Sequence, residues 1–163
     1  TPGRPLLEAA ADLSRRVHAD FAYIPGATGA DTPALEAFAA REGVCQDFAH
    51  VMLAACRAVG APAAYVSGWL RTFPPPGQPK LIGADASHAW VSVWDPVVGW
   101  TGFDPTNDMA PGEDHVALAR GRDYADCAPV SGLVVGSGGQ TLTVSVHVEA
   151  EGEGDGDGEA DAP

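Results

Sequence analysis

The chain has 163 residues, of which 45% are hydrophobic and 19% are charged, and its formal net charge is -13. This length suits one domain with a hydrophobic core rather than two, and the composition excludes a wholly disordered protein. An acidic surface repels phosphate backbones and anionic lipid headgroups, so we expect no nucleic acid and no membrane as partners. A peptide or protein substrate fits this charge better.

The end of the chain differs in composition from the rest. Residues 151–163 alternate acidic residues with glycine and hold six of the 22 acidic residues. Because such a segment has almost no apolar group to bury, it is typical of solvated, unfolded sequence. We therefore predict one domain over residues 1–150 and a disordered, acidic, glycine-rich tail over residues 151–163.

The three cysteines, Cys45, Cys56 and Cys127, are an odd and low number that argues against a disulfide framework and favours a reducing compartment. No apolar run approaches the roughly 18 residues that a membrane helix needs, and the first residues lack the layout of a signal peptide. We therefore expect a cytoplasmic protein. Without a CxxC pair or a compact set of ligands, the sequence predicts neither a metal nor another cofactor.

Helical patterns come first in the chain and extended patterns follow. Apolar residues at helical spacing predict helices over residues 6–19 and 45–59, and a proline in the first turn predicts a short helix over residues 33–41. Alternating and β-branched sequence predicts strands over residues 63–70, 88–94, 100–104 and 141–149. Residues 104–139 are predicted to be loops with one short helix at residues 115–120. This order indicates an α+β fold, with N-terminal helices packed on a mostly antiparallel β-sheet.

Cys45 lies at the predicted start of the second long helix, directly after Gly43 and Val44 interrupt the preceding pattern. A thiol is nucleophilic as a thiolate, which the dipole and unpaired N–H groups of a helix N-terminus stabilise. The same N–H groups can bind the oxyanion that forms when a thiolate attacks a carbonyl. Cys45 is therefore the candidate nucleophile, and its alternative role is a small buried hydrophobic residue. Cys56 and Cys127 are expected to be core or structural residues.

His88 and Asp104 fall where a catalytic thiolate needs an imidazole and an orienting group. His88 opens a predicted strand, and the turn at residues 95–99 returns the chain as a hairpin that brings Asp104 close to His88. The carboxylate can then orient the ring and stabilise an imidazolium. The alternative is a histidine at a strand edge and a turn-forming aspartate before Pro105.

Other titratable residues have simpler interpretations. Asp47 is expected to cap the helix start or to pair with an arginine rather than to act as a base. The four remaining histidines are interpreted as surface or helix-face residues: His18, His50, His115 and His147. The loop at residues 71–87 is expected to line an acyl cleft. The tryptophans near His88 either line the same cleft or belong to the core: Trp90, Trp94 and Trp100.

Three separated motifs closely resemble the core of the bacterial transglutaminase-like proteins of the papain-like thiol-enzyme superfamily. They are GVCQDFAHVMLAACRAVG around Cys45, SHAWVSVWDPVVGW with His88, and GFDPTND with Asp104. The resemblance covers roughly residues 21–126 and implies the papain-like fold of that family, with its nucleophile at a helix start. It also implies that Cys45 is the nucleophile, His88 the base and Asp104 the orienting group.

The resemblance has one departure and one further implication. Eukaryotic transglutaminases complete the oxyanion hole with a tryptophan upstream of the cysteine, whereas no tryptophan precedes Cys45 here. Tyr23 and Gln46 are the candidate second donors. Because the chain does not begin with Met, we expect a segment of a longer chain that an N-terminal β-rich domain precedes, as in bacterial members of this type.

The expected chemistry is thiol acyl transfer at an amide bond through a thioester. Resolution of the thioester by water gives a peptidase or amidase, and resolution by an amine gives an amine-transferring acyltransferase. The alternatives are a catalytically silent protein-binding module with the same fold and a zinc-dependent hydrolase, for which the ligand spacing is missing. The oligomeric state has no signal in the sequence.

Overall fold

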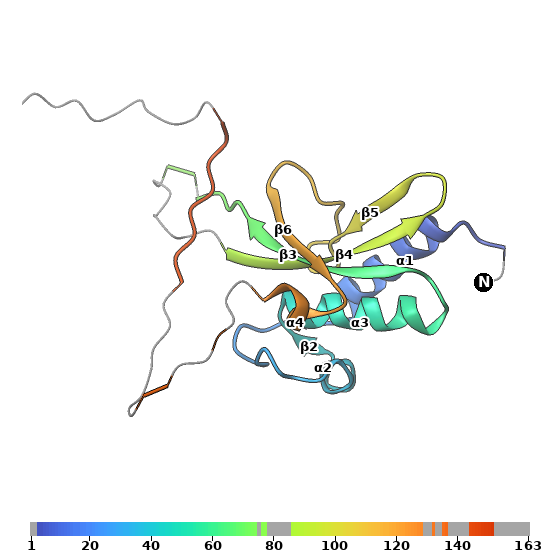
Figure 1. The fold of residues 1–163 in the computed structure, drawn as a ribbon, viewed down its shortest axis with the longest axis horizontal. Helices are drawn as coiled ribbons and strands as arrows, with labels where there is room; N and C mark the ends of the chain where they lie inside the picture. The colour runs from blue at the N-terminus through green and yellow to red at the C-terminus, as the bar shows by residue number, and fades with distance from the viewer. Residues whose placement is uncertain are drawn as a thin grey trace, which may run out of the picture.

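The helices of this chain lie on one side of a sheet formed by its later strands (Figure 1). The computed structural model describes residues 3–74, 76–77, 86–128, 132, 135–136 and 144–151. In chain order the elements are α1 (Leu6–Asp20), β1 (Ala22–Tyr23), α2 (Ala34–Ala40), β2 (Glu42–Gly43), α3 (Cys45–Ala58), β3 (Ala63–Leu70), β4 (Ala86–Asp95), β5 (Gly99–Phe103), β6 (His115–Gly121) and α4 (Tyr124–Cys127). The predicted α+β fold with helices packed on an antiparallel sheet is confirmed.

Four strands form an antiparallel sheet in the order β5-β4-β3-β6. β4 and β5 are joined by the predicted hairpin, with Asp95 opposite Gly99. On its other edge β3 pairs with β6, and the register shifts between Ser67 and Gly68. Gly68 is required there, because an added Cβ would lie 2.2 Å from the carbonyl oxygen of Val116. Glycine at this position therefore allows β6 to approach β3 closely.

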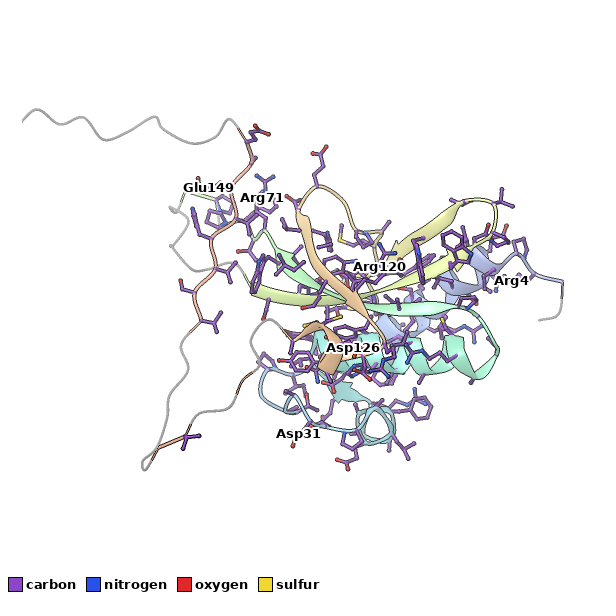
Figure 2. All side chains as sticks on the ribbon, in the orientation of Figure 1. Arg4, Asp31, Arg71, Arg120, Asp126 and Glu149 are labelled. Carbon is purple, nitrogen blue, oxygen red and sulfur yellow. The ribbon has the colours of Figure 1, made fainter. Side chains whose placement is uncertain are left out.

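The core lies between α3 and the inner strands. Phe48 and Met52 are four residues apart on α3, so they share one helix face, and both are fully buried. On β4 the alternate residues Val91 and Val93 are also fully buried. Residues of the opposite β4 face are buried as well, namely His88, Trp90 and Ser92. β4 is thus covered on both faces, which places its polar side chains out of bulk water. The side-chain view gives the same picture, with dense packing between α3 and the sheet (Figure 2).

Two of the secondary-structure predictions were wrong. The predicted short helix at residues 115–120 is strand β6, because the edge of β3 offers hydrogen-bond partners that outweigh the helix preference of its Ala, Leu and Arg residues. The predicted strand at residues 141–149 is absent in its described part, residues 144–149, where only Val146 carries a single-residue bridge and Val144 is 60% exposed. β6 takes the edge of β3 instead.

The other predicted boundaries hold within two residues. Helix α1 ends at Asp20, α2 ends at Ala40 with Arg41 in a left-handed conformation, and α3 ends at Ala58. The predicted acidic tail at residues 151–163 lies outside the described residues except for Glu151. Among the described helices, none combines the length and the apolar character needed to cross a membrane.

Candidate active site

Cys45 is the first residue of α3, as predicted, and its side chain is half-buried against the core. The helix start is fixed by the loop that precedes α2. Gln46 donates its side-chain amide to the carbonyl of Ala30 at 2.9 Å, and the Thr28 hydroxyl donates to the Asp47 carboxylate at 2.5 Å. The N-terminus of α3 is therefore tied to a loop some 15 residues upstream, which holds the thiol in one place.

Asp47 is a helix cap, which confirms one of its two predicted roles. Its Oδ2 accepts the N–H of Val44 at 2.8 Å, the residue directly before the helix, and the carboxylate is fully buried. A Cβ at Gly43 would lie 2.5 Å from the same oxygen, so the close approach requires glycine. The GVCQD sequence thus encodes both the helix start and the room for its cap.

We expect Asp47→Ala to lower the free energy of unfolding by about 1–3 kcal/mol, because it leaves the half-buried Val44 N–H and Thr28 hydroxyl without their acceptor. Urea unfolding followed by circular dichroism measures this loss. The matched control is Asp31→Ala, which removes an exposed carboxylate from the same loop region and should change stability by less than about 0.5 kcal/mol. Equal losses in the two variants would contradict the capping role.

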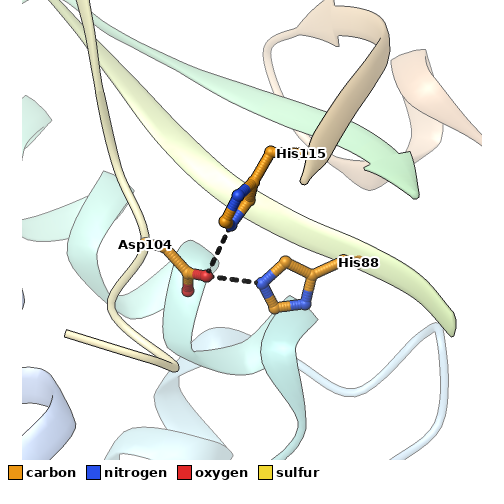
Figure 3. A group of neighbouring side chains, drawn as sticks. All are labelled: His88, Asp104 and His115. Atoms are coloured by element: carbon orange, nitrogen blue, oxygen red, sulfur yellow. Dashed lines mark hydrogen bonds and ion pairs between the residues drawn. The ribbon is translucent and has the colours of Figure 1, made fainter. Parts of the chain in front are cut away.

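The hairpin brings Asp104 to His88, as predicted. Phe103 lies opposite Val91, so Asp104 falls level with Trp90, and its side chain reaches the residue two positions along on the same face. The distance from His88 Nε2 to Asp104 Oδ2 is 2.7 Å. His88 is 7% exposed and Asp104 is fully buried, so this contact is shielded from water. Figure 3 shows the carboxylate pointing at the ring nitrogen.

Asp104 accepts hydrogen bonds at both of its oxygens. Oδ1 accepts the backbone N–H groups of Thr106 at 2.9 Å and Asn107 at 3.2 Å. Oδ2 accepts the side chains of His88, Asn107 at 2.7 Å and His115 at 3.1 Å. A buried carboxylate with this many donors keeps its negative charge and one orientation.

The charges of the pair follow from these contacts. Burial alone lowers the pKa of His88, but hydrogen bonding to Asp104 and Cys45, together with the negative charges of both, raises the pKa to about 9. Burial alone raises the pKa of Asp104, but the hydrogen bond and charge of His88, followed by Asn107 and His115, lower this pKa to about 2. At neutral pH the pair is therefore an imidazolium and a carboxylate.

The sequence-based interpretation missed His115 and Asn107. His115 was expected at the surface, yet its side chain is only 1% exposed and contacts Asp104, because β6 is a strand whose first residue faces the sheet. Asn107 lies three residues after Asp104 in the turn, and its amide also lies 3.3 Å from His88 Nε2. The TND sequence directly after the aspartate and proline was the available signal for Asn107. His115 had no signal, because only the β3–β6 pairing brings it near.

The other histidines have separate positions. His18 is exposed, as predicted, and contacts the carbonyl of Thr106. His50 lies on α3 as predicted but is half-buried, with its ring 4.9 Å from that of Tyr65, and burial lowers its pKa. His147 lies 2.5 Å from Glu149. None of these three contacts the His88–Asp104 pair in the described structure.

Cys56 and Cys127 are buried free cysteines, as predicted. Of the tryptophans, Trp90 is buried, whereas Trp94 and Trp100 are 41% and 43% exposed and pack on each other at the hairpin. Most of the loop at residues 71–87 lies outside the described residues. Trp90 is thus buried on the β4 face opposite the core residues Val91 and Val93 and packs against His88 and His115.

Two residues were candidates for the second oxyanion donor. The Gln46 amide is engaged by the Ala30 carbonyl. Tyr23 lies in β1, which pairs with β2 so that Tyr23 is level with Gly43, two residues before the nucleophile. Burial and the negative charge of a Cys45 thiolate both raise the pKa of Tyr23, so the phenol and the sulfur are close enough to interact.

His88, Asp104 and His115 also form a group of the kind that can hold a metal ion, since their ligand atoms all lie within 4.8 Å of one another. The hydrogen bonds around them oppose a cation. Asn107 donates to the same carboxylate oxygen, and the N–H of Gly112 points at His115 Nδ1 at 3.4 Å. A metal on Nε2 of a neutral imidazole leaves the proton on Nδ1, where it would face that N–H.

The comparisons with known proteins bear on the family of this fold and site. The family model described as the transglutaminase-like superfamily matches residues 1–105, a range that includes Cys45, His88 and Asp104. The chain belongs to this superfamily. The resemblance of the three motifs is thereby confirmed.

Individual relatives agree with this membership. An uncharacterized protein of Mycobacterium tuberculosis is 49% identical over 82% of this chain and 44% of its own length. A protein-glutamine gamma-glutamyltransferase of Pseudomonas aeruginosa is 38% identical over 80% of this chain and 20% of its own length. The solved structure of a proposed cysteine protease from Cytophaga hutchinsonii superposes with a TM-score of 0.65 at 31% identity, covering 78% of this chain and 40% of that one. The chain thus spans less than half the length of these relatives.

Proposed function

We propose that this transglutaminase-like protein is a thiol-dependent enzyme that cleaves or transfers acyl groups at amide bonds of peptides or proteins. The observations that carry the proposal are the buried contact of His88 with Asp104 at 2.7 Å and the influence of Cys45, at the start of α3, on the pKa of His88. Acyl transfer requires a nucleophile, a proton carrier and a carboxylate that orients the proton carrier. A silent binding module has no need of this arrangement.

In the first half of the reaction Cys45 acts as thiolate and His88 as imidazolium. Because Nε2 of His88 faces Asp104, Nδ1 is the nitrogen that exchanges a proton with sulfur and substrate. The sulfur attacks the amide carbonyl, and the tetrahedral intermediate collapses as the C–N bond breaks. His88 gives its proton to the leaving amine or ammonia, so a thioester on Cys45 and a neutral imidazole remain.

In the second half water or a primary amine attacks the thioester. Neutral His88 accepts the proton of the attacking group, the C–S bond breaks, and Cys45 leaves as thiolate. The imidazolium and thiolate of the resting state are restored. Asp104 holds the ring in the required orientation throughout and is not itself protonated.

The oxyanion of both halves would be bound by the backbone N–H at the start of α3 and by the hydroxyl of Tyr23. Two features of Tyr23 support this role: it lies level with Gly43 in the β1–β2 pair, and it interacts electrostatically with Cys45. We expect Tyr23→Phe to lower kcat about 10²- to 10³-fold with little change in KM, because the donor acts on charge that develops in the transition state. Steady-state kinetics measures both constants.

The comparison variant is Gln46→Ala, which removes the other candidate donor. Since the Gln46 amide is already engaged by Ala30, this variant should change kcat only a few-fold through a less firmly held loop. A larger loss in Gln46→Ala than in Tyr23→Phe would reverse the assignment.

The names of two relatives support the two outcomes of the second half. The Pseudomonas aeruginosa relative is named for glutamine acyl transfer and the Cytophaga hutchinsonii structure for cysteine proteolysis. The acidic composition of the chain supports a peptide or protein substrate over nucleic acid. Water and amine therefore compete for one thioester in the proposed reaction.

The test is to incubate the protein with a library of glutamine-containing peptides, with and without a biotinylated primary amine, and to follow ammonia, new N-termini and biotin incorporation. Intact-protein mass spectrometry after acid quench should show an acyl adduct that maps to Cys45. Parallel iodoacetamide labelling should modify Cys45 well before the buried Cys127. Equal labelling of the two cysteines, with no adduct and no product, would favour the silent binding module.

A further inference from the structure

The proposed mechanism does not use the second imidazole at the candidate active site, that of His115. β6 lies at one edge of the sheet and β5 at the other. The loop between them nevertheless brings His115, the first residue of β6, into contact with the Asp104 carboxylate. Figure 3 shows Asp104 between the two rings. One buried carboxylate thus accepts from two histidines, and Cys45 raises the pKa of one of them, His88.

The surroundings of His115 fix its ring in one place. Its backbone N–H donates to the Gly112 carbonyl at 3.0 Å, and its ring packs edge-on against Trp90 with 5.3 Å between centroids. The preceding residue, Asp114, is held by the Arg71 guanidinium at 2.6 Å. Because backbone, ring face and neighbouring residue are all held, the side chain has little freedom to leave the carboxylate.

The hydrogen bonds also fix where the proton of His115 lies. The Gly112 N–H points at Nδ1, so this nitrogen is an acceptor, and the proton must lie on Nε2, which faces Asp104 at 3.1 Å. A protonated His115 would carry a second N–H on Nδ1, directed against the Gly112 N–H. The contacts therefore favour a ring that donates to Asp104 through Nε2. A metal would need the opposite tautomer.

A second imidazole that donates to Asp104 changes how strongly the carboxylate can stabilise the charge of His88. His115, Asn107 and His88 share one oxygen, Oδ2, so each donor takes part of its charge. The charged or titratable groups that face His88 are Cys45 from α3, Asp104 after β5 and His115 from β6. With Cys45 acylated its charge is gone, and Asp104 alone then holds the His88 proton.

We propose that His115 is a positioning residue that withdraws charge from Asp104, so that His88 can act as a neutral base when water or an amine attacks the thioester. The proposal rests on the proposed function. The two halves of the reaction require opposite charge states of His88: the first requires an imidazolium and the second a neutral imidazole. Asp104 without its second histidine would favour the imidazolium too strongly for the second half.

The test compares His115→Leu, which removes the donor, with His115→Gln, whose amide nitrogen can take the place of Nε2. For His115→Leu we expect kcat at neutral pH to fall on the order of tenfold, the acyl-enzyme on Cys45 to accumulate, and the acid limb of deacylation to move to higher pH. Formation of the adduct and labelling of Cys45 should stay near the parent rates. His115→Gln should restore the pH limb. Urea unfolding checks that both variants fold.

A purely structural role would lower stability in both variants and leave the acid limb where it is, which would overturn the inference. Equal limbs in His115→Leu and His115→Gln would do the same. Nitrogen NMR of the resting protein provides a readout that needs no activity: it should show His115 with its proton on Nε2, and His88 retaining its proton to higher pH in His115→Leu. A proton on Nδ1, or tight Zn²⁺ binding at these rings, would contradict the proposal.

The outcomes separate this inference from the proposed function. If Cys45 forms no adduct and labels no faster than Cys127 in the parent protein, the proposed function fails, and NMR alone decides the charge-sharing at Asp104. If Cys45 forms the adduct and both His115 variants match the parent in pH profile and NMR, the proposed function stands and only the role of His115 is lost.

Discussion

We expect Cys45→Ala to lower amide-bond turnover by about 10³-fold or more, with no acyl adduct on the protein, because no other described thiol can replace the sulfur. The remaining cysteines, Cys56 and Cys127, are 4% and 3% exposed, and burial raises the pKa of each thiol. Both therefore stay protonated and out of reach of substrate. Initial rates of ammonia release and biotin-amine incorporation measure the loss.

The matched control for Cys45→Ala is Cys56→Ala, which removes a thiol from the same helix three turns later. This variant should keep activity within about twofold and lose only some stability, since its sulfur belongs to the core. Retention of substantial turnover by Cys45→Ala, or a comparable loss in both variants, would show that the thiol at the start of α3 is not the nucleophile.

For Asp104→Asn we expect kcat/KM to fall on the order of 10³- to 10⁴-fold, because the amide removes the negative charge that stabilises the imidazolium and can present the wrong group to His88 Nε2. The shape of the pH profile should change with it. In the parent protein the pKa of His88 is raised to about 9, so the imidazolium needed for the first half is present at neutral pH and is lost as pH rises through about 9. Without Asp104 this alkaline limb should move to lower pH.

The dependence of kcat/KM on pH for parent and variant measures both effects.

The contact between His88 and Asp104 also affects stability. The pKa of Asp104 is lowered to about 2 from its usual 3.8, so its stabilising contribution is present above about pH 3.8 and is lost as pH falls through about 2. Acid unfolding of Asp104→Asn should lack this component. An unmoved alkaline limb would mean that Asp104 does not control the His88 proton.

Asp95, a half-buried residue at the end of β4, offers a control for the aspartate substitution. It accepts the backbone N–H groups of Val97 and Val98 in the hairpin turn, away from the carboxylate that contacts His88. Asp95→Asn keeps an acceptor oxygen for the turn, so kcat/KM and its pH limbs should remain close to those of the parent. A tenfold loss in this variant would indicate that the hairpin as a whole, rather than the charge of Asp104, sets activity.

Much of the candidate site could be predicted from the sequence because its parts are local. Cys45 and Asp47 lie in one helical turn, where interrupted periodicity, a following acid and a preceding glycine are sufficient to indicate a capped helix start. His88 and Asp104 belong to one hairpin, and the short turn at residues 95–99 fixes which residues meet across it. Local hydrogen bonds and a two-residue repeat determine these positions whatever the rest of the chain does.

The tertiary structure alone decided the parts that depend on distant segments. Residues 115–120 have the composition of a short helix, and they form β6 because the edge of β3 provides a partner, which a single segment does not encode. That pairing buries His115 and brings it to Asp104. Residues 144–149 form no strand despite their alternating pattern, apart from the single-residue bridge at Val146.

The sequence by itself thus determined the order of helices and strands from α1 to β5, apart from the two-residue strands β1 and β2, together with the capped thiol at the start of α3 and the histidine and aspartate of one hairpin. Each of these depends on residues within about 20 positions of one another. Only the tertiary structure decided that the hairpin meets the helix start at Cys45 and that a second imidazole shares the Asp104 carboxylate. These contacts join segments from both edges of the sheet, and the energy that selects them is burial and strand pairing rather than local preference.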